Sequence, residues 1–163
     1  MRIQITLFLS VLLFTITACK DVVKKDQSVK EIPKMTAKEI LSNPEYLAIS
    51  YGGYRDTTRS VQPSLVQIKN DMKILAAMNI KILRTYNMQL PQATNVVKAI
   101  DQLKKEQPGF EMYVMLGAWI DCKNAWTGLE PDHHIESEQN AAEIDRAVTL
   151  AAQYPDIIKI IAV

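Results

Sequence analysis

The feature that most constrains the fold is a regular alternation of apolar, β-branched runs with amphipathic segments along residues 46–163. Four runs have the composition of strands, and the segments between them repeat apolar residues at helical spacing. We expect strands at residues 46–54, 80–86, 110–120 and 157–163, and helices at residues 63–79, 93–109 and 140–154. Strands that alternate with helices predict an α/β fold with a parallel sheet.

The helices carry signals for where they begin and for which face is buried. Thr36 with Glu39, and Ser64 with Gln67, have the spacing of capping boxes, so a short additional helix is expected after Thr36. Each longer helix also has a predicted apolar face. These faces comprise Ile68, Met72, Leu75 and Ala76; then Val96, Val97, Ile100 and Leu103; and finally Ile144, Ala147, Val148 and Ala151.

Two architectures share this order of elements. A doubly wound nucleotide-binding sheet would need a glycine-rich phosphate turn after its first strand, but Gly52-Gly53 is followed by Tyr54 and Arg55, and no phosphate-binding motif occurs. A (β/α)8 barrel instead places function at the carboxyl ends of its strands. We therefore predict the first four strands of a (β/α)8 barrel, that is, the N-terminal half of one.

Polar and aromatic residues gather where the first three strands end. Aromatic rings stack on the apolar faces of sugars, while amides and charges bind the hydroxyl groups, so this rim indicates a sugar site. The residues are Tyr51, Tyr54 and Arg55; then Arg84, Tyr86 and Asn87; and finally Trp119, Asp121 and Lys123.

The N-terminus has the pattern of a secretory signal. Arg2 precedes an apolar stretch, and Ile16-Thr17-Ala18-Cys19 resembles the lipobox of bacterial lipoproteins. We expect residues 1–18 to be a signal peptide and residues 19–35 a charged, aromatic-free tether that begins at a lipidated Cys19. The folded domain is expected at 36–163, and the protein outside the cytoplasm, anchored to the outer membrane or cell surface.

Charge and cysteine content give no sign of a nucleic-acid partner or of an intramolecular disulfide. Arg2 is the only charged residue before Cys19, so the mature part carries 18 basic and 18 acidic groups and gives no reason to expect nucleic acid. With Cys19 lipidated, Cys122 has no partner for an intramolecular disulfide and is interpreted as a small, partly buried residue. No cofactor is expected.

The segment "DCKNAWTGLEPDHHIESE" contains both histidines. His133 and His134 are adjacent in an acidic loop and lack the i, i+4 spacing of a zinc site, so no metal is expected. We interpret the segment as a solvated loop beside the sugar site, with Trp126 as a possible platform for a sugar ring.

Several stretches in order resemble the bacterial branch of glycoside hydrolase family 17, the β-1,3-glucanase-like retaining enzymes of a (β/α)8 clan. They are "AISYGGYRD", "PSLVQIKNDMKILAAMNIKILRTYN", "EMYVMLGAWID" and "YPDIIKIIAV", from about Ala48 to Val163. The resemblance implies a membrane-anchored hydrolase of β-glucan, and we expect β-1,3 linkages. The alternative is a non-catalytic surface lipoprotein that binds glycans.

The resemblance also implies where the chemistry lies. In the family the fourth strand continues into Gly-Asn-Glu, which holds the acid/base, and the nucleophile follows the seventh strand, so both are expected beyond Val163. The final run, "IIKIIAV", reads as an inner strand, and the chain is expected to be truncated there and inactive alone.

The resemblance assigns supporting roles to several residues of this chain. It assigns a catalytic role to none of them. Arg84 matches a position near the nucleophile, and Tyr51 and Tyr86 match rim tyrosines. Trp119 and Asp121 are assigned to sugar contact. Many relatives in the family have an Asp where this chain has Asn87, so no charged role is carried over there.

Overall fold

The computed structural model describes residues 34–163. The predicted signal peptide, Cys19 and the tether up to residue 33 lie outside the described residues. The first described helix, α1 (Ala37–Leu41), begins at the capping box predicted for Thr36 and Glu39, with both of its reciprocal hydrogen bonds present. The predicted capping box at Thr36 and Glu39 is therefore confirmed.

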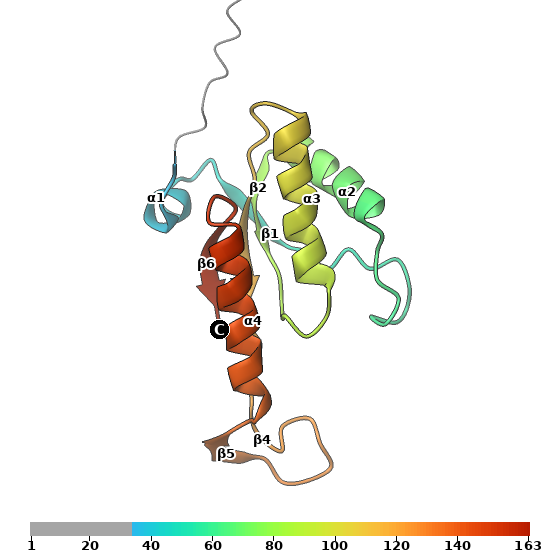
Figure 1. Ribbon diagram of the computed structural model, residues 1–163, viewed down its shortest axis with the longest axis vertical. Helices are drawn as coiled ribbons and strands as arrows, with labels where there is room; N and C mark the ends of the chain where they lie inside the picture. Colours follow the sequence, from blue (N-terminus) through green and yellow to red (C-terminus); the bar gives the residue numbers. More distant parts are fainter. Residues whose placement is uncertain (1–33) are drawn as a thin grey trace, which may run out of the picture.

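The centre of the fold is a four-stranded sheet whose neighbouring strands are all parallel (Figure 1). It is formed by β1 (Leu47–Ser50), β2 (Ile80–Arg84), β3 (Tyr113–Gly117) and β6 (Ile158–Ala162), in that order across the sheet. A helix lies between each strand and the next along the chain. The predicted α/β class with four parallel strands is confirmed.

Three helices cover one face of this sheet (Figure 1). They are α2 (Leu65–Ala77), α3 (Gln92–Glu106) and α4 (Gln139–Gln153). The predicted capping box of Ser64 and Gln67 starts α2. The main core lies between these helices and the sheet, where Leu83, Val114 and Leu116 are buried. The face predicted for α3 is buried throughout, and Ile68 and Met72 of α2 are buried with it.

The opposite face of the sheet has a smaller core. Ile40 of α1 is fully buried there with Ile82 and Tyr113, and Tyr46 packs beside them. Because side chains alternate between the two faces of a strand, Ile82 and Arg84 lie on this face while Leu83 lies in the helix-side core. The short helix α1 thus covers this second face near the starts of the strands.

A polar cluster joins the second core to the starts of the strands. The Glu111 carboxylate accepts hydrogen bonds from the hydroxyls of Tyr46 (2.6 Å) and Tyr113 (3.1 Å), and Lys81 Nζ lies 3.3 Å from it. The bond to Glu111, together with burial, raises the pKa of Tyr46 to about 12. Burial acts to raise the pKa of Glu111, but the hydrogen bonds from Tyr46, Lys81 and Tyr113 outweigh it and lower that pKa.

The face predicted for α4 is wrong in two of its four positions. Ile144 and Val148 are 44% and 54% exposed, whereas Asn140 and Glu143 are buried with Ala147. The helix is turned so that two polar side chains point toward the ends of the strands, where they bind backbone groups. Hydrophobicity alone could not predict this orientation, because the backbone groups come from other parts of the chain.

The run at residues 157–163 forms the predicted strand, β6, which pairs in parallel with β3; its place as an inner strand of a complete barrel stays a prediction. One further prediction needs correction. The segment after β3 was expected to be a loop, but it contains an antiparallel hairpin of β4 (Cys122–Lys123) and β5 (Asp132–Glu136). Those strands are short and mostly polar, so they lack the apolar alternation that identifies a strand.

None of the helices in residues 34–163 is both long enough and apolar enough to cross a bilayer.

The Glu111 cluster predicts acid-sensitive stability. Because its pKa is lowered in the folded protein, the stabilisation is present above the ordinary carboxyl pKa and is lost as the pH falls through the folded value. We expect Glu111→Gln to lower the free energy of unfolding at pH 7 by about 1 to 3 kcal/mol. The difference from the unmodified chain should shrink from about pH 5 to about pH 3, as measured by urea unfolding.

Glu45→Gln is the matched control, because Glu45 is exposed and its carboxylate has no hydrogen bond or ion pair to residues 34–163. It should change the unfolding free energy little at any pH. A Glu111→Gln chain whose deficit stayed constant down to pH 3 would show that the Glu111 carboxylate is not the acid-sensitive group.

Candidate sugar-binding rim at the strand ends

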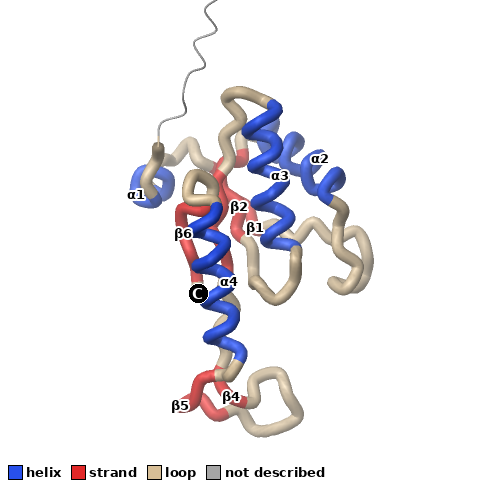
Figure 2. The backbone as a smooth tube through the Cα atoms, in the orientation of Figure 1, coloured by secondary structure: helices blue, strands red, loops and turns tan. Residues whose placement is uncertain are grey.

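The carboxyl ends of β1, β2 and β3 lie level with one another. Ser50 pairs with Arg84, and Arg84 with Met115, so the segments that leave these strands emerge at one edge of the sheet. In Figure 2 the loops after β1 and β2 are drawn in tan, and the segment after β3 is a tan loop that contains the β4–β5 hairpin, drawn in red. Eight of the nine predicted rim residues lie in these loops, and Arg84 is the last residue of β2.

Buried polar side chains hold this edge in place. In the described part of the chain, four polar or charged residues are buried, and each binds backbone at the strand ends: Thr85, Gln92, Asn140 and Glu143. A buried polar group without a partner is costly, so each of these bonds restricts the loop that it touches.

Thr85 and Gln92 join neighbouring strands and helices at the rim. Thr85 Oγ1 accepts a hydrogen bond from Gly117 N at 3.1 Å, and Gln92 Nε2 donates to the carbonyl of Tyr51 at 3.0 Å. The backbone at Thr85 approaches Gly117 so closely that a Cβ atom on Gly117 would collide with the Thr85 carbonyl oxygen. Glycine is therefore required where β2 and β3 end together.

Glu143 of α4 is the deepest of these groups, with no exposed surface. Its Oε1 accepts hydrogen bonds from the backbone N–H of Met88 (2.5 Å) and of Trp119 (3.1 Å), and its Oε2 accepts from Arg146 at 2.8 Å. One carboxylate therefore joins the loop after β2 to the loop after β3. The guanidinium of Arg146 compensates its charge.

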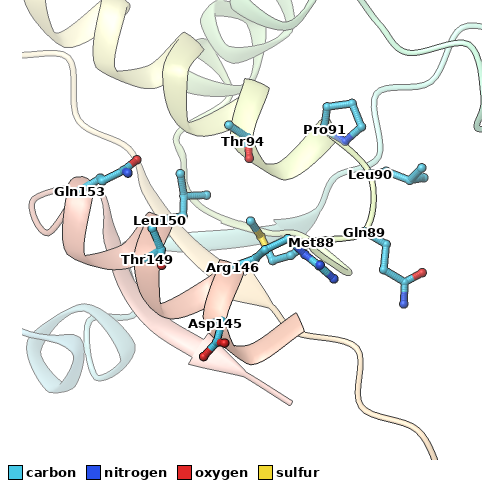
Figure 3. Close-up of a pocket in the computed structure, with 10 residues that line it drawn as sticks. All are labelled: Met88, Gln89, Leu90, Pro91, Thr94, Asp145, Arg146, Thr149, Leu150 and Gln153. Carbon is cyan, nitrogen blue, oxygen red and sulfur yellow. The ribbon is translucent and has the colours of Figure 1, made fainter. Parts of the chain in front are cut away.

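A cavity of about 560 Å³ lies behind this junction, between α4 and the loop and first turn of α3 (Figure 3). Arg146 and Met88 line it, as do Thr94 and Gln153. None of the predicted site residues lines this cavity, although Met88, Gln89 and Leu90 belong to the same loop after β2 as Tyr86 and Asn87.

A smaller pocket of about 190 Å³ lies at the rim itself, between the loops after β1 and β2. The structure brings Tyr86 and Asn87 there together with Tyr54, Arg59 and Gly52. Tyr86 is 44% exposed. An aromatic ring, an amide and a guanidinium around one hollow can bind a sugar ring by stacking and by hydrogen bonds to its hydroxyls.

Tyr51, predicted as a rim contact, is turned away from this pocket. Its side chain is 8% exposed, and its hydroxyl donates to Asp71 of α2 at 2.7 Å. Burial, followed by the bond to Asp71, raises the pKa of Tyr51. Arg55 also binds Asp71, at 2.6 Å. Tyr51 therefore packs the first loop against α2, and substrate contact by its ring stays a prediction.

Gly53 is part of the same packing. It has a φ of 69°, and a Cβ atom at that position would collide with the hydroxyl of Tyr51. The glycine turn predicted at this place is thus required both by the left-handed backbone and by the buried tyrosine.

Arg84 is exposed at the end of β2. Within residues 34–163, its guanidinium forms no ion pair. A cation that lies at the strand ends without a carboxylate partner can stabilise a negative charge brought next to it.

Trp119 and Asp121 lie together after β3, and Trp126 joins them. Trp119 Nε1 donates to Asp121 Oδ2 at 2.7 Å, and Trp126 Nε1 donates to Asp121 Oδ1 at 3.1 Å. The two rings have centroids 6.1 Å apart. Each carboxylate oxygen of Asp121 thus accepts one indole N–H, and sugar contact by Asp121 stays a prediction.

The two histidines lie on β5 of the hairpin. His133 Nδ1 is 3.5 Å from Cys122 Sγ, and Cys122 is half-buried. Over the described residues, no three His, Cys, Asp or Glu side chains are grouped in a way that could hold a metal ion.

Sequence reasoning missed the buried groups that hold the rim. Asn140, Glu143, Ala147 and Leu150 share one face of α4 at spacings of three, four and three residues. Because Asn140 and Glu143 are polar and the competing face with Ile144 and Val148 is more apolar, this spacing gave no signal that the face is buried. Gln92, just after Pro91 at the start of α3, gave no signal either.

Comparison with known proteins gives one informative similarity. No protein-family model matches the sequence, and no curated protein matches it. The chain is similar to a crystal structure of an endo-laminarinase from Formosa Hel1_33_131, with 63% sequence identity and a TM-score of 0.76. The match covers 78% of this chain and 33% of that one. The four-stranded parallel sheet thus corresponds to about a third of a larger enzyme, as expected for part of a (β/α)8 barrel.

The hydrogen bonds of Glu143 predict how substitutions at this position change the stability of the fold. Glu143→Leu leaves the Met88 and Trp119 N–H groups and the Arg146 guanidinium without their acceptor, and should cost about 2 to 4 kcal/mol in the free energy of unfolding. Glu143→Gln keeps an acceptor oxygen for both N–H groups and should cost about half as much or less. Urea unfolding measures both.

Asp145→Leu and Asp145→Asn are the matched controls, since Asp145 is on the same helix and is exposed. Both should lie within about 0.5 kcal/mol of the unmodified chain. Equal losses for Glu143→Leu and Asp145→Leu would contradict a specific role for Glu143.

Proposed function

We propose that this chain is part of a glycoside hydrolase that cleaves β-glucan, and that its substrate has β-1,3 linkages. The observation that carries the proposal is the 63% identity to an endo-laminarinase over 78% of the chain. Laminarin is a β-1,3-glucan. The chain spans a third of the length of that enzyme, so the activity is proposed for the full-length protein.

The geometry of the rim supports a sugar substrate. The pocket with Tyr54 and Tyr86 and the pair of tryptophans both offer aromatic faces, and polar groups lie beside them. Sugars need this combination because their ring faces are apolar and their edges carry hydroxyls. A binding surface without catalysis would use the same features, so the test must detect bond cleavage.

We propose further that the chain belongs with glycoside hydrolase family 17 and that the reaction retains the anomeric configuration. In such a mechanism one carboxylate attacks the anomeric carbon and a second protonates the leaving oxygen. No acidic residue of this chain is assigned to either role. Arg84, exposed and without an ion pair among the described residues, would stabilise the ionised nucleophile.

The activity is tested with the full-length protein on laminarin, by the release of reducing ends. We expect hydrolysis, with kcat lowered by roughly 100-fold in Arg84→Ala because a fixed charge near the nucleophile is lost. Arg84→Lys should recover part of this loss. Lys73→Ala removes an exposed cation of α2 and should leave kcat unchanged.

Two outcomes would contradict parts of the proposal. Binding of laminarin without release of reducing ends would favour a glycan-binding protein. Proton NMR during early hydrolysis reports the anomer: a β-anomer formed first supports retention, and an α-anomer formed first contradicts it.

We also propose that the protein is a lipoprotein anchored outside the cytoplasm through Cys19. The support is the pattern Ile16-Thr17-Ala18-Cys19 after an apolar stretch. Cells that express the protein should incorporate labelled palmitate into it, and Cys19→Ser should abolish the label, whereas Cys122→Ser should retain it. Equal labelling of both variants would contradict anchoring at Cys19.

A further inference from the structure

Gln92 is a buried residue whose side-chain amide is only half used by the fold. It is the first residue of α3 and is 4% exposed. Its Nε2 donates to the carbonyl of Tyr51 at 3.0 Å, whereas its Oε1 has no hydrogen-bond partner among residues 34–163. Because an unpaired polar atom on a buried side chain is costly, this free oxygen needs an explanation.

The free oxygen of Gln92 is open to the rim pocket. Gln92 lines that pocket together with Gly52, Tyr54 and Tyr86. In the described part of the chain, the side-chain atom that is both enclosed and unpartnered is Gln62 Oε1, so Gln92 Oε1 is accessible from the pocket that its residue lines. The bond to Tyr51 fixes the amide, and the acceptor is therefore oriented before any ligand arrives.

Asn87 presents the complementary group. Its Oδ1 accepts a hydrogen bond from the backbone N–H of Leu90 at 3.3 Å, so this amide is held by its oxygen. Its Nδ2 has no partner within residues 34–163, and Asn87 lines the same pocket. The pocket thus offers a fixed acceptor from Gln92 and a fixed donor from Asn87.

This pair of amides suits a hydroxyl group better than an ion. A hydroxyl both donates and accepts hydrogen bonds, so it can satisfy Gln92 Oε1 and Asn87 Nδ2. A carboxylate or phosphate would be repelled by the Gln92 oxygen. An ammonium would be repelled by Arg59, which lines the pocket and forms no ion pair among the described residues. A neutral ligand with hydroxyl groups satisfies all three side chains.

The size of the pocket fits one sugar unit. Its volume of about 190 Å³ is below the roughly 300 to 1,000 Å³ of sites for drug-sized ligands. Tyr54 and Tyr86 supply aromatic rings at its walls. A single sugar ring has little room to turn in such a hollow, so the same hydroxyl faces Gln92 each time the ring binds.

We propose that Gln92 is a specificity-determining residue, whose Oε1 accepts a hydrogen bond from one hydroxyl of the sugar unit in the rim pocket. Asn87 donates to the same hydroxyl or to its neighbour. A sugar that lacks this hydroxyl, or carries it as an ether, leaves the oxygen of Gln92 unpaired and is rejected. The choice of a sugar as the ligand rests on the proposed function.

Binding is tested with methyl β-D-glucopyranoside and its 2-, 3-, 4- and 6-deoxy analogues. The full-length protein is titrated by NMR and observed at the side-chain amide signal of Gln92, which is assigned by its absence in Gln92→Met. We expect one analogue to bind about tenfold more weakly than the parent sugar and to leave this signal unshifted. Equal binding of the parent sugar and all its analogues would overturn the proposal.

A cycle of changes in ligand and protein separates recognition from folding. Gln92→Met removes both polar atoms and keeps the length of the side chain. The parent sugar and the rejected analogue should bind this variant equally, because the oxygen that distinguished them is gone. A structural role alone would weaken both sugars by the same factor and keep the tenfold difference, which would overturn the proposal.

Gln92→Glu keeps an acceptor oxygen but cannot donate to the carbonyl of Tyr51. It should retain part of the preference for the parent sugar, since the hydroxyl still finds an acceptor. Loss of the preference as complete as in Gln92→Met would contradict recognition by Oε1.

Gln89→Met is the matched control, because Gln89 is an exposed glutamine of the same loop and does not line the rim pocket. It should keep the full tenfold difference between the parent sugar and the rejected analogue. An equal loss of discrimination in Gln89→Met and Gln92→Met would overturn a specific role for Gln92.

A parallel assay of laminarin hydrolysis keeps the role of Gln92 apart from the proposed function. If the full-length protein cleaves laminarin but binds every deoxy sugar as well as the parent, the role of Gln92 is overturned and the function stands. If one deoxy sugar is rejected through Gln92 and laminarin is not cleaved, the role of Gln92 stands and the hydrolase function is contradicted.

Discussion

The arrangement of the candidate site depends on one buried carboxylate. Glu143 accepts the backbone N–H groups of Met88 and Trp119, which lie in loops after two different strands. A buried charge needs both hydrogen bonds and a compensating ion, and Arg146 supplies the ion from the next turn of the same helix. Three more buried side chains also bind backbone groups at the strand ends: Thr85, Gln92 and Asn140. The loops at the carboxyl ends are therefore fixed by buried polar groups.

The fixed loops carry two aromatic surfaces at the rim, one in a hollow and one exposed. The pocket with Tyr54 and Tyr86 is a small hollow between the first two loops. The tryptophan pair stands more exposed beyond β3, oriented by Asp121. The positions of these surfaces follow from the parallel sheet, because parallel strands direct all their carboxyl ends to one edge.

Prediction from sequence succeeded where the signal is local. The capping boxes at Thr36 and Ser64 start their helices as expected, and the buried face of α3 follows from its apolar spacing. The β4–β5 hairpin escaped prediction because its strands are short and polar. Tyr51 was correctly placed just after β1, yet its side chain turned to Asp71, which lies 20 residues further along the chain.

The sequence by itself determined the order of strands and helices, the parallel sheet, and the edge at which polar and aromatic residues gather. Each of these depends on the periodicity of neighbouring residues. Only the tertiary structure decided which face of α4 is buried and that Asp121 holds two tryptophans. Those outcomes depend on hydrogen bonds such as that between Glu143 and Met88, which are 55 residues apart, and no local pattern encodes a partner at that distance.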